Sequence, residues 1–174
     1  MPLTVSPTAE NAVSDLRALV LSIVPTNTPV LIGLANRVAT PWPLTGFVYL
    51  TPIHQERLEW NTDTLQTSPA AVKLIQMAIR LDVQIDCYGP LAADWATMIH
   101  AVYFDEYACD LMVNSQPLFM ASEPQMAPLV DSEAQYEQRW TMTAAMQFNP
   151  VVQPAQLYAN ALDVTLVNVQ ETYR

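Results

Sequence analysis

Histidine and carboxylate side chains in the middle of the chain are the residues best suited to hold a metal ion or move a proton. The two histidines are His54 and His100. Four acids lie close to His100 in sequence: Asp94, Asp105, Glu106 and Asp110. A metal site needs at least three ligands that converge on one point. At helical spacing Asp94 and His100 lie well off a shared face, so we interpret the acids as a solvated surface and expect neither metal nor cofactor.

Motifs for nucleophilic catalysis and for phosphate binding do not occur in the sequence. There is no Gly-x-Ser-x-Gly turn and no protease-like cysteine, and both Cys87 and Cys109 look packed. The three glycines are too scattered to form a dinucleotide fingerprint or a phosphate-binding loop. We therefore expect a protein that is not an enzyme. One alternative stays open, a hydrolase that combines a pair of carboxylates with one of the histidines.

The charge of the 174-residue chain is strongly acidic. Seven lysines and arginines stand against seventeen aspartates and glutamates, which gives a formal charge of −10, and the basic residues form no stripe. Sequence-specific binding to DNA or RNA is therefore not expected. The acidity serves either solubility or the wall of a channel through which DNA slides without sticking. Because neither a leader nor a run of ~20 apolar residues is visible, we expect no membrane contact and folding in the cytoplasm.

Two amphipathic helices are predicted. The first begins near Pro7, with Ser6 as its N-cap, and ends at Pro25, because a proline there removes a hydrogen-bond donor. The second follows Gly89 and Pro90. Its core-facing residues recur at spacings of three and four: Leu91, Trp95, Met98, Ile99, Val102 and Tyr103. Each helix has one apolar face, so each is expected to pack against another element.

Alternation of apolar and polar residues predicts the strands. The clearest pattern covers residues 80–87, and four of its side chains would face a core: Leu81, Val83, Ile85 and Cys87. Four further segments are expected as strands: 30–32, 47–51, 140–148 and 162–170. Residues 73–79 fit either a helix or a backward extension of the strand at 80–87.

Stretches rich in proline and polar residues separate these elements. We expect ordered loops at three segments: 25–46, 61–72 and 111–132. The order of helix, strands, helix and strands predicts a single α+β domain over residues 1–174. In that fold one mainly antiparallel sheet is flanked by two main helices.

An ordered set of short motifs resembles a known family. The motifs are QIDCYG at 84–89, FDEYACD at 104–110, PLF at 117–119, PLV at 128–130, QYEQRW at 135–140 and QFNP at 147–150. In this order and at these intervals the chain is similar to the neck or tail terminator proteins, also called tail completion proteins, of long-tailed bacteriophages. The similarity extends from about residue 12 to residue 172.

The resemblance implies a structural virion protein of the phage neck. Such a protein would form a homohexameric ring on the last ring of the tail tube, stop tube polymerisation and offer a docking surface to the head–tail connector. The implied partners are other copies of the chain, the tail tube protein, the connector protein and DNA that passes through the lumen without sequence-specific binding. A head-side completion protein or a tail tube subunit would also assemble into rings, and both remain as alternatives.

A ring requires two different, complementary patches on each subunit. The apolar fraction of 51% leaves apolar side chains for such contacts. We expect contact residues in the two later loops and near an exposed strand edge: Arg57, Leu65, Pro117, Phe119, Pro128 and Arg139. Arg139 would also form a surface ion pair with Glu106 or Asp105.

Overall fold

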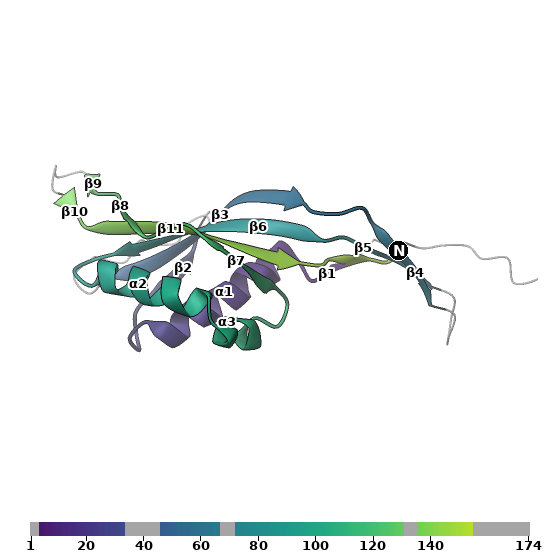
Figure 1. Ribbon diagram of the computed structural model, residues 1–174, viewed down its shortest axis with the longest axis horizontal. Helices are drawn as coiled ribbons and strands as arrows, with labels where there is room; N and C mark the ends of the chain where they lie inside the picture. Colours follow the sequence, from purple (N-terminus) through teal and green to yellow (C-terminus); the bar gives the residue numbers. More distant parts are fainter. Residues whose placement is uncertain (1–3, 34–45, 67–71, 131–135, 155–174) are drawn as a thin grey trace, which may run out of the picture.

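The computed structural model describes residues 4–33, 46–66, 72–130 and 136–154. Within these residues three helices lie on one side of a six-stranded sheet, and a four-stranded sheet projects from one end of it (Figure 1). The predicted α+β fold is therefore confirmed, although the described residues form a four-stranded and a two-stranded sheet in addition to the one sheet that was expected. The strand predicted at 162–170 lies outside the described residues, as do positions 34–45 of the first predicted loop.

The larger sheet is mainly antiparallel. Its strands are β2 (Val30–Ile32), β3 (Phe47–Arg57), β6 (Ile79–Tyr88), β11 (Arg139–Phe148), β7 (Gln116–Ala121) and β8 (Gln125–Met126). They follow the order β2-β3-β6-β11-β7, and β8 pairs with the start of β11. β2 and β3 run parallel, while the other neighbouring strands run antiparallel. Because β6 pairs along its whole length with β3 and β11, it holds the centre of the sheet.

β6 is apolar on one face and polar on the other. The four residues predicted to face a core are buried: Leu81, Val83, Ile85 and Cys87. β11 alternates in the same way, and four of its predicted core residues are buried: Met142, Ala144, Met146 and Phe148. Directly paired residues of antiparallel strands share a face. The two strands therefore present their apolar side chains together to the helix layer, as the alternation predicted.

The first helix, α1 (Ala9–Ile23), is capped by Thr8 rather than by Ser6. The Thr8 hydroxyl accepts from the Asn11 backbone N–H at 3.2 Å, and Asn11 Oδ1 accepts from the Thr8 backbone N–H at 2.8 Å. These reciprocal bonds satisfy free donors of the first turn. Ser6 instead belongs to an antiparallel strand pair, so the predicted cap is wrong. The predicted end of the helix before Pro25 is confirmed.

The second helix, α2 (Ala92–Tyr103), buries a stripe that differs from the predicted one. Leu91 and Met98 were expected in the core but are 48% and 41% exposed. The buried residues of the helix are Ala92, Trp95, Ala96, Ile99 and Tyr103. Two alanines in this stripe allow the helix to lie close to the sheet, and the larger side chains on either side of the stripe turn towards solvent. The prediction is thus confirmed for three of its six positions, Trp95, Ile99 and Tyr103.

The segment predicted as a loop at 111–132 contains regular structure. A short helix, α3 (Glu106–Leu111), precedes it, and Asp105 caps this helix by accepting from the Tyr107 backbone N–H at 2.9 Å. The segment then forms β7, β8 and β9 (Leu129–Val130), of which β9 pairs with β10 (Tyr136–Glu137). The prolines misled the prediction, because an edge strand such as β7 tolerates a residue without an N–H donor.

The smaller sheet extends beyond the helix layer (Figure 1). Its strands are β1 (Val5–Ser6), β12 (Val151–Val152), β5 (Val72–Gln76) and β4 (Thr62–Gln66), in that order across the sheet. We call β4, β5 and the turn at 58–61 the arm. The loop predicted at 61–72 is therefore wrong for 62–66. At 73–79 the helix is wrong, and the strand structure that is present is not an extension of the strand at 80–87: β5 is a separate strand of the smaller sheet, and β6 extends back only to Ile79. An ion pair of 2.7 Å between Lys73 Nζ and Asp63 Oδ2 links β5 to β4.

Asp15 fastens α1 to the connection between α3 and β7. Its buried carboxylate accepts hydrogen bonds from the Asn114 backbone N–H at 2.7 Å, from Asn114 Nδ2 at 3.0 Å and from the Ser115 hydroxyl at 3.0 Å. These donors lie about a hundred positions further along the chain. The carboxylate thus links this connection to α1 across a long separation in sequence.

We expect Asp15→Ala to lower the free energy of unfolding by about 1–3 kcal/mol, because it leaves buried donors without an acceptor. The measurement is urea unfolding followed by circular dichroism. Ser14→Ala, an exposed neighbour on the same helix, is the matched control and should change stability by less than about 0.5 kcal/mol. Equal midpoints for the two variants would show that the carboxylate does not hold the connection.

Candidate interaction surfaces

The helices cover one face of the larger sheet, and no helix in the described part of the chain covers the other, which we call the open face (Figure 1). The strand register gives its composition. β6 contributes Arg80, Asp82, Gln84, Asp86 and Tyr88, and β11 contributes Arg139, Thr141, Thr143, Ala145 and Gln147. β3 adds Phe47, Tyr49, Thr51, His54 and Glu56. The open face is therefore dominated by hydroxyl, amide and charged groups.

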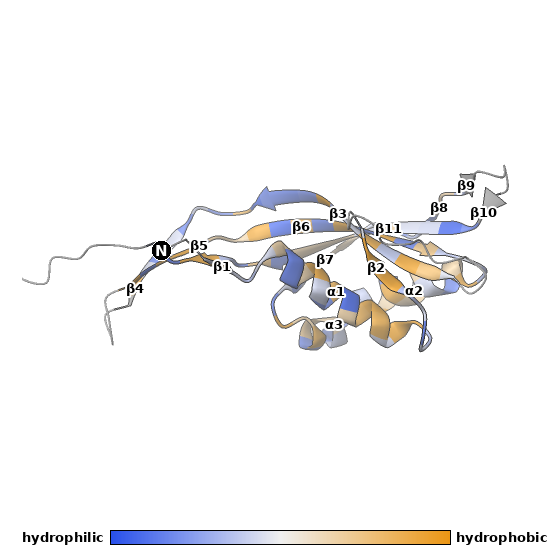
Figure 2. Ribbon diagram, turned by 180° about the vertical axis from the view of Figure 1, so that it is seen from behind, coloured by the Kyte–Doolittle hydropathy of each residue, from blue (hydrophilic) through white to orange (hydrophobic). Residues whose placement is uncertain are grey.

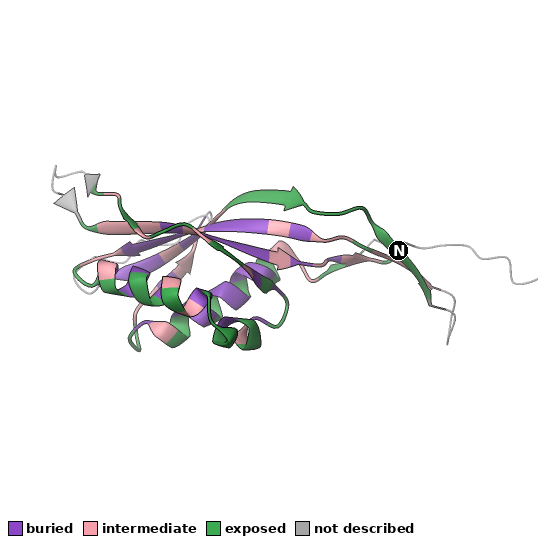
Figure 3. Cartoon of the chain, viewed as in Figure 1, coloured by how far each residue is buried: buried purple, intermediate pink, exposed green. Residues whose placement is uncertain are grey.

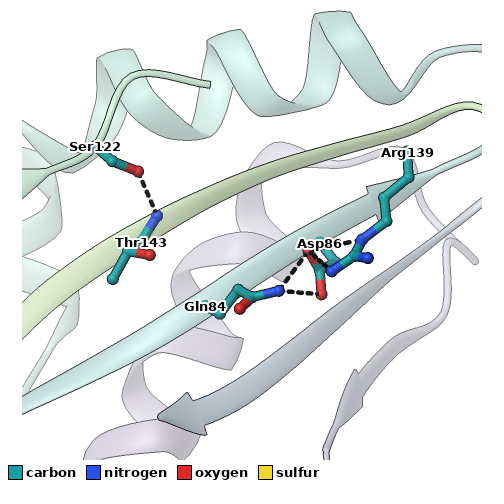
Figure 4. A network of polar contacts seen from close by, with 5 residues as sticks. All are labelled: Gln84, Asp86, Ser122, Arg139 and Thr143. Carbon is teal, nitrogen blue, oxygen red and sulfur yellow. Dashed lines mark hydrogen bonds and ion pairs between the residues drawn. The ribbon is translucent and has the colours of Figure 1, made fainter. Parts of the chain in front are cut away.

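Asp86 lies at the centre of a polar network on the open face (Figure 4). Arg139 donates to Asp86 Oδ1 from Nε at 3.1 Å and from Nη2 at 2.9 Å, and Gln84 Nε2 contacts the two carboxylate oxygens at 3.0 and 2.9 Å. The Arg139 guanidinium also lies 5.8 Å from the centre of the Tyr88 ring. Asp86 is only 4% exposed. A buried carboxylate is costly unless it is paired and hydrogen-bonded, and this network meets both conditions.

The partner of Arg139 differs from the predicted one. Arg139 lies opposite Tyr88 in the register, which places its side chain diagonally next to Asp86 on the neighbouring strand. Glu106 and Asp105, the predicted partners, belong to the helix layer on the other side of the sheet. The predicted ion pair is therefore wrong, because the strand pairing brings Arg139 to an acid 53 positions earlier in the chain.

A second arginine on the open face is neutralised in the same way. Arg80 Nε donates to Asp82 Oδ1 at 2.7 Å, and this hydrogen bond is the main reason why the pKa of Arg80 is raised. At the edge of the sheet, the Thr143 backbone N–H donates to the Ser122 hydroxyl at 2.8 Å (Figure 4). The charged groups of the open face thus bind mainly to one another.

The turn of the arm, residues 58–61, presents a tryptophan to solvent. Arg57 holds the turn, because its Nε donates to the Glu59 carbonyl at 2.8 Å and its guanidinium also donates to Asn61 Oδ1. Trp60, between these two acceptors, is 90% exposed. Other large apolar side chains are exposed on β3, in the turn and on β4: Ile53, Leu58 and Leu65. Figure 3 shows the exposed end of β3, and Figure 2 shows that apolar positions continue onto the smaller sheet.

A groove lies on the body of the molecule, between α3, the start of β7 and the end of β11. Its volume is about 530 Å³, and its apolar lining includes Met112, Val113, Phe119 and Phe148. Cys109 also lines it. None of the residues that line the groove is charged, although the chain as a whole is strongly acidic. Phe119 adopts a positive φ of 51°, which is unusual for a bulky residue, and its ring lies 6.4 Å from that of Phe104.

The six predicted contact residues are distributed over these surfaces. Arg57 and Leu65 are exposed on or beside the arm, and Phe119 is half-exposed at the groove. Pro128 is exposed between β8 and β9. The remaining two are engaged within the chain, since Pro117 is buried in β7 and Arg139 binds Asp86. Sequence reasoning missed Trp60, although a tryptophan in a polar turn was a usable signal.

The residues considered for catalysis are separated in the structure. His100 packs edge-to-face against Phe104 at 5.0 Å in the helix layer, whereas His54 lies opposite Asp82 on the open face. Among the described residues no three histidines, cysteines or acids gather into a metal-binding group. In that same part of the chain, no helix is both long and apolar enough to cross a membrane.

The two cysteines lie in opposite environments. Cys87 is fully buried in β6, as predicted, whereas Cys109 is exposed on α3, so its predicted packing is wrong. The helical structure is interrupted between α2 and α3, and the short helix α3 buries only Ala108. Burial raises the pKa of Cys87 from 9.0 to about 12, with a smaller contribution from the negative charge of Asp86.

The sequence matches the family described as phage neck terminator protein over residues 11–173. The chain belongs to this family. The membership assigns it a structural role in the neck of a bacteriophage, and hence a place in the virion and contacts with other phage proteins. No curated protein matches the chain.

We expect the Cys87 thiol of the neck terminator to resist modification in the folded state. A pKa of about 12 leaves roughly a thousandfold less thiolate at pH 8 than a thiol with the ordinary value of 9.0. Chains that carry Cys109→Ser should therefore react with Ellman's reagent only in denaturant. Rapid reaction of the folded variant would contradict the burial of Cys87.

Proposed function

We propose that this neck terminator forms a ring, a hexamer by its resemblance to tail terminators, which caps the end of the tail tube. Family membership supports the place of action. The observation that carries the ring is that the chain has two unlike surfaces, a projecting arm with Trp60 and a receding groove whose lining residues are uncharged. Two unlike, complementary surfaces make a head-to-tail contact, and such a contact closes into a ring when the rotation between subunits allows it.

The arm and groove are suited to each other in chemistry. Trp60 offers a large apolar side chain on a turn that Arg57 already orders, so docking would cost little further entropy. The groove contains no charged lining residue, which removes the repulsion that two chains of charge −10 would otherwise meet at that point. The arm itself carries charges of both signs, such as Lys73 and Asp63, whereas α3 and its cap carry only acids.

Capping follows from the ring. One end of the ring would seat on the last ring of tail tube protein, and its other end would present a surface that cannot recruit another tube ring. Polymerisation would then stop, and the head–tail connector protein would dock on the free end. DNA would pass through the lumen without sequence-specific contacts. In this proposal the chain acts by its shape and needs no catalytic group.

Removal of the arm's tryptophan tests the ring contact. We expect Trp60→Ala to weaken subunit association by about 2 kcal/mol or more per contact, roughly 30-fold, because buried tryptophans are frequent hot spots. Mass photometry of the full-length chain should show closed rings for the unmodified protein and mainly monomers for the variant. Leu91→Ala removes an exposed apolar side chain at the start of α2 and is the matched control.

The reactivity of Cys109 supplies a second measurement on the same samples. This thiol lines the groove, so it should react slowly with Ellman's reagent in assembled rings and rapidly in the Trp60→Ala monomers. Rings that persist in the variant with Cys109 still protected would exclude the arm as the contact. A strictly monomeric unmodified chain would contradict the ring itself, and long self-stacked cylinders would favour a tube subunit.

A further inference from the structure

The open face differs in chemistry from the surfaces proposed for subunit contacts. Large apolar side chains with high exposure lie on the arm, around the groove and on the outer side of the helices, where Leu91, Met98 and Tyr107 are exposed. The three central strands present mainly threonines, glutamines and charged groups on the open face, together with three aromatic residues: Phe47, Tyr49 and Tyr88. Interface cores are depleted in charged residues and enriched in apolar and aromatic ones. The charged and amide side chains at the centre of the open face therefore fit water better than the core of a subunit contact.

The charges of the open face cancel within the face. Two arginines and three carboxylates occupy its central strands: Arg80, Arg139, Glu56, Asp82 and Asp86. Arg139 donates to Asp86 from two of its nitrogen atoms, and Arg80 donates to Asp82 at 2.7 Å. The side chains of Arg139 and Arg80 are only 23% and 27% exposed. Each guanidinium of this face is therefore already held by a carboxylate in the same subunit.

Arginine is the residue that binds phosphate best, because its planar fork matches two oxygen atoms. A duplex that touched an unpaired arginine in every subunit would be retained, and the retention would grow with the number of phosphates contacted. Arginines that are already paired with carboxylates, on a face with a slight excess of acid, would offer a passing phosphate no net attraction.

We propose that the open face lines the path of double-stranded DNA, and that Asp86 and Asp82 mask Arg139 and Arg80 so that the duplex slides without being held. This inference rests on the proposed ring, whose lumen it assigns to one face of the sheet. The masking pairs also explain why arginines stand on such a face at all, since they allow carboxylates to be buried at the centre of the sheet.

Unmasking one arginine tests the inference. In assembled rings, Asp86→Asn keeps the shape of the side chain and removes its charge, so Arg139 becomes free to attract phosphate. We expect the ring to bind linear duplex DNA at least about tenfold more tightly at about 50 mM salt. In a plot of the logarithm of the association constant against the logarithm of the salt concentration, the negative slope should steepen by about 0.9 for each additional phosphate contact. Fluorescence anisotropy measures both quantities.

Two controls separate masking from a general change in charge. Asp94→Asn removes the same charge from an exposed position on α2, on the other side of the sheet, and should leave DNA binding unchanged. Adding Arg139→Gln to Asp86→Asn should return binding to that of the unmodified ring. Equal gains for Asp94→Asn and Asp86→Asn, or no rescue in the double variant, would overturn the masking.

A topological comparison tests the location of the face. A duplex that must thread through a lumen needs a free end, so the affinity gained in Asp86→Asn should be seen with linear DNA and be nearly lost with closed circular DNA of the same length. Equal gains with both forms would place the open face outside the lumen. Asp86→Asn chains that melt normally but no longer form rings would make it a subunit contact, which also overturns the inference.

These outcomes distinguish failure of the proposed ring from failure of the assignment of the open face. If the unmodified chain forms no rings, the proposed function fails before DNA is added. If rings form and Asp86→Asn gains no affinity for DNA, the ring stands and the assignment of the open face fails.

Discussion

The alternation of β6 is the constraint on which the rest of the structure depends. This strand pairs on both sides along its whole length, so its two faces must satisfy two different environments. One face is apolar and buries its side chains under the helices, while the other carries Asp82, Gln84 and Asp86. A shift of the register by one residue would exchange the two faces, and a carboxylate held by Arg139 would enter the apolar core.

The same constraint separates the surfaces of the molecule by chemistry. Because the helices occupy one face of the sheet, the polar face stays open and neutralises its own charge through paired side chains. Exposed apolar side chains gather on the arm, around the groove and on the outer side of the helices. Surfaces suited to protein contacts are thereby kept apart from the surface that we assign to the DNA path, as a terminator ring would require.

The sequence predicted the parts of the fold in which local pattern and tertiary environment agree. β6 and β11 each have one buried and one polar face, so alternation revealed them, and the interruption at Pro25 correctly ended α1. β4 was not predicted because it is exposed on both faces and its sequence resembles a polar loop. β7 was not predicted because Pro117 suggested a loop, although an edge strand accepts a proline. The stripe of α2 was misjudged because alanines, rather than the larger Leu91 and Met98, face the sheet.

The candidate surfaces were less predictable, because they depend on residues that are distant in sequence. Arg139 finds Asp86 only through the pairing of β11 with β6, and the groove combines residues of α3, β7 and β11. Cys109 was misplaced because the break before α3 turns it outward. The family resemblance, by contrast, rested on the order of short motifs, which does not require knowledge of their contacts, and it is confirmed over nearly the whole chain.

The central claim is that this neck terminator stops tube growth by closing as a ring on the tube end. Negative-stain electron microscopy of tail tubes incubated first with the purified chain and then with fresh tail tube protein tests it most directly. The account predicts one ring at one end of each tube and no further elongation of that end. Tubes that continue to lengthen from a decorated end, or chains that bind along the sides of tubes, would contradict it.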